Sequence, residues 1–250
     1  MPAIDFFHNW FNSPYYHKLY HQRHEDEARH FIKRLTEQLQ IPAGSSLLDT
    51  ACGRGQLTQY LASLGFDVTG MDLSEENIRN AQQLAGDQLR FYRHDIRLPF
   101  WINYFDYAFN FFTSFGYFNT ARENANALRT ISQSLKPDGY FLIDYLNVHY
   151  VEEHLQIRQE ELIGDVQYNI TKWFDENFFH KKIEVIDPSL EEPAIYTEQA
   201  AKYTLGDMTE MLAFQNLQIQ EVYGDYLLGP YDLNRSPRMI ILAKKISNPS

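Results

Sequence analysis

Three carboxylates stand where three successive hydrophobic runs end, and their spacing could build one binding site. Asp49, Asp72 and Asp95 each close a short run of strand-forming residues. If these runs are parallel strands, their carboxyl ends meet at the edge where open α/β sheets bind ligands. There Asp49 suits a cationic amino group, Asp72 the two hydroxyls of a ribose, and Asp95 the amino group of an adenine. The three acids together predict an adenosine-containing ligand.

The loop after Asp49 consists mainly of small residues. Ala51, Gly53 and Gly55 would let the backbone turn tightly and approach a ligand closely. A dinucleotide loop would read G-x-G-x-x-G, but Thr58 stands at the third glycine position. An acid at the strand end would also repel a pyrophosphate. A nicotinamide oxidoreductase is therefore disfavoured, while a tight turn without a ligand remains an alternative for the loop taken alone.

The stretch Asp49-x-Ala51-Cys52-Gly53-x-Gly55 resembles motif I of the class I S-adenosylmethionine (SAM)-dependent methyltransferases. Asp72 and Asp95 match the family's ribose-binding and adenine-binding acids, and residues 135–139 (LKPDG) resemble its LKPGG motif, although Ala51 and Asp138 replace common glycines. The resemblance implies a Rossmann-like seven-stranded sheet whose last strand is antiparallel. It also implies SAM as cofactor, S-adenosylhomocysteine (SAH) as product, and these cofactor-binding residues: Asp49, Ala51, Gly53, Gly55, Asp72, Leu73, Asp95, Ile96, Phe111 and Phe112.

A narrower resemblance concerns the acceptor side. A tyrosine-rich N-terminal helix, a Thr-Ser-Phe-Gly-Tyr loop at 113–117 and a late β insertion resemble the N-methyltransferases of nucleotide-linked amino sugars. This implies that an N-terminal segment folds over SAM, with Tyr16 and Arg23 in contact with it. Tyr117 stands where those enzymes usually carry a histidine, and its ordinary pKa of about 10 makes it a poor base. Tyr16 and Tyr117 are the candidate catalytic residues.

The elements that must position these residues alternate along the chain. Strands and helices alternate over residues 45–147, which predicts an α/β fold with a parallel sheet and helices on both faces. A helical cap over 1–40 precedes this SAM-binding core. An antiparallel β insertion over 155–203 should cover the site, and a helix and two strands over 204–245 should close a single methyltransferase domain over 1–250. The expected core strands are 46–49, 67–72, 89–94, 105–111 and 140–146. The expected helices are 25–39, 56–64, 74–84 (with Ser74 as its cap), 122–135 and 204–215. The insertion should hold three strands, near 166–170, 179–185 and 195–203.

Composition limits the partners. The chain has 250 residues and a formal net charge of −11, which disfavours a nucleic-acid partner. Its single cysteine permits no internal disulfide, and we see neither a signal peptide, nor a membrane span, nor a metal-ligand cluster. We therefore expect a cytoplasmic protein with no membrane partner and no metal. Exposed strands of the insertion make a homodimer an open alternative.

The leading prediction is a SAM-dependent methyltransferase that transfers a methyl group to a nitrogen or oxygen atom of a small molecule. One alternative is a methyltransferase that acts on a macromolecule. For a DNA adenine methyltransferase, an Asn-Pro-Pro-Tyr-type tetrapeptide is missing after the fourth strand, where residues 110–113 read NFFT. A second alternative is a SAM-binding regulatory protein without catalysis, because residues that bind SAM do not by themselves prove methyl transfer.

Overall fold

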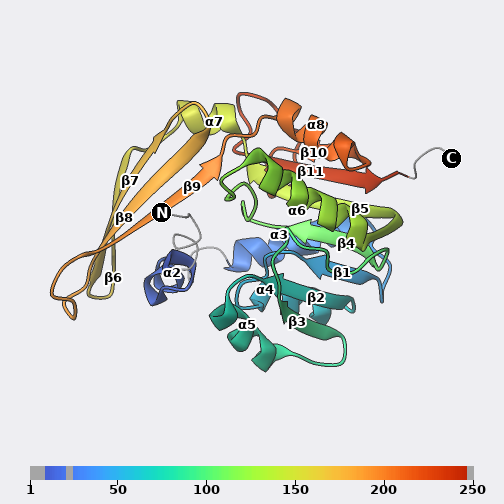
Figure 1. Cartoon of the computed structure of the whole chain (residues 1–250), viewed down its shortest axis with the longest axis horizontal. Helices are drawn as coiled ribbons and strands as arrows, with labels where there is room; N and C mark the ends of the chain where they lie inside the picture. The colour runs from blue at the N-terminus through green and yellow to red at the C-terminus, as the bar shows by residue number, and fades with distance from the viewer. Residues whose placement is uncertain (1–8, 21–24, 247–250) are drawn as a thin grey trace.

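The computed structural model describes residues 9–20 and 25–246, which form two sheets (Figure 1). The larger sheet has seven strands in the order β10-β11-β5-β4-β1-β2-β3. β1 to β5 run parallel, whereas β11 is antiparallel to both β5 and β10. This confirms the Rossmann-like sheet and its antiparallel last strand. The strands are β1 (Ser46–Asp49), β2 (Asp67–Asp72), β3 (Leu89–Arg93), β4 (Phe105–Asn110), β5 (Leu135–Leu146), β10 (Leu217–Tyr223) and β11 (Arg238–Lys245).

Helices cover both faces of this sheet, as predicted, and each face has its own hydrophobic core. On one face α6 (Ala121–Ser134) and α8 (Leu205–Phe214) pack against the strands. On the other face lie α3 (Glu25–Gln38), α4 (Gln56–Ser63) and α5 (Glu75–Ala81), the last continuing into a 3-10 turn (Gln82–Leu84). Central strands buried between two helical layers need apolar residues on both sides, and β11 accordingly reads MIILA at 239–243, all buried.

The smaller sheet is an antiparallel meander beside the main sheet (Figure 1). It consists of β6 (Arg158–Ile163), β7 (Val166–Phe174), β8 (Phe178–Ile186) and β9 (Ala194–Ala201). One face packs on Trp10, Leu19 and the short helix α2 (Pro14–Tyr20). The N-terminal segment therefore rests on the inserted sheet.

Three details differ from the expected elements. The inserted sheet has four strands, because β6 is a largely exposed edge strand whose sequence RQEELI lacks the alternation that marks a half-buried strand. β5 begins at Leu135 instead of at the expected residue 140, so it includes the LKPDG segment, where Asp138 adopts a left-handed conformation with φ of 64°. A short helix, α7 (Val148–Glu153), joins the two sheets. None of the helices in the described part of the chain has the length and apolar character needed to cross a membrane.

Candidate functional site

A cavity of about 1000 Å³ lies between the two sheets. Its floor is formed by residues that directly follow β1, β2, β3 and β4, and its roof by β7, β8 and β9. Among the residues predicted from the sequence, Gly55 does not line it, and Arg23 lies outside the described residues. The predicted residues that do line it are Tyr16, Asp49, Ala51, Gly53, Asp72, Leu73, Asp95, Ile96, Phe111, Phe112 and Tyr117.

Asp49 is a buried carboxylate held by the helix that follows it. Its Oδ2 accepts a hydrogen bond of 2.7 Å from Thr58 Oγ1 on α4. Burial raises the pKa of Asp49 to about 6, although hydrogen bonds from Thr58 and the Ala51 backbone oppose this shift. Thr58, which replaces the third glycine of the dinucleotide pattern, therefore holds the Asp49 side chain in place. A cation beside Asp49 would relieve the cost of its burial.

Asp72 links the loop after β1 to the start of α5. Its Oδ2 accepts from the Gly53 backbone N–H at 3.0 Å, and its Oδ1 accepts from the Ser74 N–H at 2.8 Å. Burial raises its pKa, while these two backbone donors and Asn77 oppose the rise. Asn77 Nδ2 also donates to Oδ1, at 3.4 Å, so the free acceptor capacity lies mainly on Oδ2, where a ligand hydroxyl could donate.

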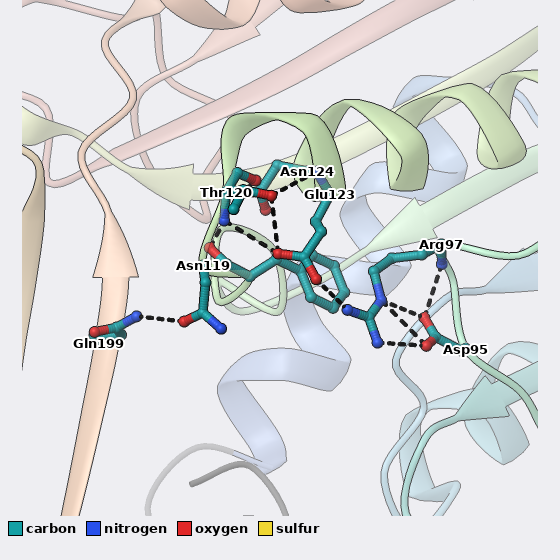
Figure 2. Close-up of polar contacts among 8 residues, drawn as sticks. Asp95, Arg97, Asn119, Thr120, Glu123, Asn124 and Gln199 are labelled. Atoms are coloured by element: carbon teal, nitrogen blue, oxygen red, sulfur yellow. Dashed lines mark hydrogen bonds and ion pairs between the residues drawn. The ribbon is translucent and has the colours of Figure 1, made fainter. Parts of the chain in front are cut away.

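Asp95 is held by the arginine two residues further on (Figure 2). Arg97 Nε lies 3.0 and 3.1 Å from the two carboxylate oxygens, and Nη2 lies 2.7 Å from Oδ2. Burial raises the pKa of Asp95, but the hydrogen bonds and charge of Arg97 outweigh burial, and the pKa is lowered overall. Sequence reasoning did not identify Arg97; the i, i+2 spacing of acid and arginine was the available signal.

The loop after β4 carries backbone strain. Phe112 and Thr113 have φ of 55° and 58°, a left-handed conformation that costs non-glycine residues about 1–2 kcal/mol each. The buried Asp144 of β5 holds the loop, because its Oδ2 accepts from the Phe112 N–H at 2.8 Å and its carbonyl accepts from the Thr113 N–H at 3.0 Å. Arg238 pairs with Asp144 at 2.6 Å and donates to Thr113 Oγ1 at 2.8 Å. Strained backbone of this kind clusters at active sites and ligand-binding sites, where the surrounding structure holds it in place.

The two candidate catalytic tyrosines stand in an aromatic part of the cavity wall. Phe11 packs edge-on against both Tyr16 and Tyr117, with ring centroids 5.1 and 5.5 Å apart. Burial raises the pKa of each tyrosine, and the negative charge of Glu198 is the second-largest cause of the rise. Both phenols are therefore neutral at physiological pH and can donate or accept a hydrogen bond.

A charged row crosses the roof of the cavity and was not foreseen from the sequence. Lys172, Lys181 and Glu198 are directly opposite one another on β7, β8 and β9, and all three line the cavity. Lys181 Nζ lies 3.5 Å from Glu198 Oε2, and Lys172 Nζ donates to Gln159 Oε1 at 3.2 Å. Only the pairing of the strands brings these residues together, so no spacing in the sequence could reveal the row.

The wall fits the cofactor that the sequence predicts. A Cβ atom added at Gly53 would meet nothing within 4 Å, so the loop presents open space to a ligand. Asn77 Oδ1 is buried in the wall beside Asp72 and has no hydrogen-bond partner among the residues described. Gly55 is needed for packing and not for ligand access, because a Cβ atom there would lie 2.7 Å from the Phe91 ring.

Comparisons with known proteins identify the family of this chain. A sequence profile described as a methyltransferase domain matches residues 20–182. The dTDP-3-amino-3,4,6-trideoxy-alpha-D-glucopyranose N,N-dimethyltransferase of Streptomyces venezuelae is 29% identical over 103 residues, 41% of this chain and 43% of that protein. A ubiquinone biosynthesis O-methyltransferase of Caulobacter vibrioides is 49% identical over 45 residues, 18% of each chain. The chain spans about half the length, or less, of the curated relatives it matches.

Solved structures share the fold over nearly the whole chain. A SAM-dependent methyltransferase from Clostridium acetobutylicum has a TM-score of 0.76 at 20% identity, covering 93% of this chain and 97% of that one. CalS10, an amino pentose methyltransferase from Micromonospora echinaspora solved with SAM bound, has a TM-score of 0.70 at 18% identity, with the same two coverages. Because the profile matches more than half of its length, the chain belongs to the methyltransferase-domain family, and its fold is that of SAM-dependent methyltransferases.

Proposed function

We propose that this protein is a SAM-dependent methyltransferase that transfers a methyl group to a nitrogen or oxygen atom of a small molecule. One observation carries the proposal: a single cavity joins the three acids at the strand ends to an aromatic and charged compartment under the inserted sheet. The first part suits a cofactor and the second an acceptor. A protein that only senses SAM has no need of the second compartment.

Each end of the cofactor has a candidate partner. Asp49 would take the amino group, Asp72 the ribose hydroxyls and Asp95 the adenine amino group, with Leu73 and Ile96 beside the nucleoside. Phe111 and Phe112 would flank the methionyl arm, with Ala51 and Gly53 leaving room for it. When bound, SAM supplies an electrophilic methyl group on its sulfonium. The chain's own residues then have to align the acceptor and exclude water.

An amine is the acceptor that this chemistry favours. Tyr16 and Tyr117 are buried phenols with raised pKa values, so they would orient an acceptor by hydrogen bonding and would not deprotonate it. A neutral amine needs no such deprotonation before it attacks, whereas a hydroxyl does. The relatives that act on amino sugars support the same choice.

Calorimetric titration with SAM and SAH tests the proposal first. Asp72→Asn keeps the shape of the side chain but removes its charge and half of its acceptor capacity, so we expect SAM affinity to fall at least about tenfold. Asp106→Asn is the matched control, because Asp106 also accepts a backbone N–H, that of Ser46 at 2.8 Å, but at the amino end of β1. It should bind SAM as the wild type does.

A positive titration leads to an acceptor screen, with SAH release as the readout. Amines and hydroxyl compounds of the size of an amino sugar form the panel. No binding of SAM or SAH by the wild type rejects the function. Tight SAM binding without transfer to any member of the panel favours the regulatory alternative.

A further inference from the structure

Asp95, the carboxylate proposed to accept a hydrogen bond from the adenine amino group, already accepts hydrogen bonds from several donors of one residue, Arg97. Arg97 presents three N–H groups to Asp95: its backbone N–H at 2.9 Å from Oδ1, Nε shared between both oxygens, and Nη2 at 2.7 Å from Oδ2. An ionised carboxylate has about four acceptor sites. These three N–H groups make four hydrogen bonds, two on each oxygen, so Asp95 is nearly saturated as an acceptor and keeps capacity for no more than a single amino group.

Arg97 is itself held in place from a second element. Its Nη1 lies 2.6 Å from Glu123 Oε1, and Glu123 forms the capping box of α6 with Thr120. The guanidinium also lies over the Phe118 ring, 4.6 Å from its centroid, and Phe118 lines the cavity. Figure 2 shows the guanidinium between the two carboxylates, next to the start of α6. Arg97 thus cannot swing away without breaking contacts on two sides.

The same polar cluster reaches the inserted sheet. Asn119 accepts a hydrogen bond of 3.1 Å from Gln199 of β9, and Asn124 donates to the Thr120 carbonyl at 3.2 Å (Figure 2). The segment that carries Arg97's contacts is therefore linked to β9 through Asn119 and braced internally by Asn124 at the start of α6. This is more scaffolding than a surface ion pair requires, since an exposed pair contributes little stability.

We propose that Arg97 is a positioning residue that keeps Asp95 oriented and able only to accept, so that the pocket selects a 6-amino purine over a 6-oxo purine. The inference rests on the proposed function and deepens it. A carboxylate fixed in this way offers no proton to the oxygen of a 6-oxo purine. Without the guanidinium, Asp95 is free to rotate or to take up a proton, and a protonated carboxyl can donate to that oxygen. Preference for the amino group then falls.

The test compares the affinities of the full-length protein for SAH and for S-inosylhomocysteine, in which an oxo group replaces the 6-amino group and N1 carries a hydrogen. A charge-assisted hydrogen bond changes affinity about 10- to 100-fold, so the wild type should prefer SAH by that factor. Arg97→Gln should reduce the preference to about threefold or less, mainly by weakening SAH. Arg97→Lys, which keeps the charge but loses the planar fork, should give an intermediate ratio.

Arg90→Gln is the matched control, because Arg90 pairs with Asp67 at 2.7 Å at the opposite end of β2 and β3. It should keep the full preference. If the wild type binds SAH but does not distinguish the two ligands, or if Arg97→Gln keeps the wild-type ratio, the inference is wrong while the proposed function stands. If the wild type binds neither ligand, the proposed function itself fails. The ratio of the two affinities separates positioning from a general loss of folded protein, which would lower both alike.

Discussion

Replacing Asp49 with asparagine should stabilise the protein while weakening its ligand site. Asp49 is 3% exposed, and burial raises its pKa from 3.8 to about 6. The ionised form of Asp49 is therefore disfavoured in the folded state. At neutral pH the shift in pKa corresponds to a loss of at most about 3 kcal/mol in the free energy of unfolding. An amide carries no charge and avoids this cost.

The geometry allows both side-chain contacts of Asp49 to be kept in the exchange. In the Asp49→Asn variant, the amide oxygen of the new side chain can accept from the Ala51 N–H, which already bonds to Asp49. The amide nitrogen can donate to Thr58 Oγ1, which now donates to Asp49, because a hydroxyl can serve in either role. The buried hydrogen bonds therefore survive with one reversed.

Urea unfolding of wild type and Asp49→Asn at a series of pH values provides the assay. The folded-state pKa lies above the unfolded one, so the cost is absent below about pH 4, grows between about pH 4 and 6, and is complete above. The variant should gain about 1–3 kcal/mol at pH 8, about half as much at pH 5 and almost nothing at about pH 3. Excess SAM should reverse the order, because ligand stabilises only the protein that binds it. An Asp49→Asn protein no more stable than wild type at pH 8, or a gain independent of pH, would refute the reasoning.

Two further substitutions test how the site is built. Gly55→Ala should destabilise the protein by about 2–4 kcal/mol in urea unfolding, because Gly55 has φ of 84° and an added Cβ would lie 2.7 Å from Phe91; a change below about 0.5 kcal/mol would contradict the steric argument. Tyr145→Phe should cost about 1–3 kcal/mol, because the buried Tyr145 hydroxyl donates to the Ala201 carbonyl of β9 at 2.6 Å and its loss leaves that oxygen unpaired. If Tyr145→Phe has the same midpoint of thermal unfolding as the wild type, the hydrogen bond from Tyr145 to Ala201 does not contribute to stability.

The parts of the fold that sequence could predict depend on local signals. β1 and β2 have the predicted bounds, because each is a short apolar run closed by an acid and followed by a helix start. The acids Asp49, Asp72 and Asp95 come together in the cavity wall because parallel strands bring their carboxyl ends to one edge.

The remaining parts depend on contacts between distant residues. Asp144 and Arg238, which hold the strained loop, are 94 residues apart, and neither lies in a recognisable motif. β6 has no apolar face because it is an edge strand, so periodicity could not mark it. The helical cap, the homodimer and Arg23 as a contact residue stay predictions.

The position of β11 within the sheet has a consequence for how the chain folds during synthesis. β11 lies between β5 and β10, although it follows both along the chain. The meander β6 to β9 pairs only neighbours in sequence and can form as it leaves the ribosome. By contrast, β5 can pair with β4 at once, but its other edge stays unpaired until β11 follows about ninety residues later. Until Arg238 arrives, Asp144 has no counter-ion and the loop at 112–113 has no clamp. A nascent chain can therefore complete the inserted sheet before the clamp on the loop at 112–113 is in place.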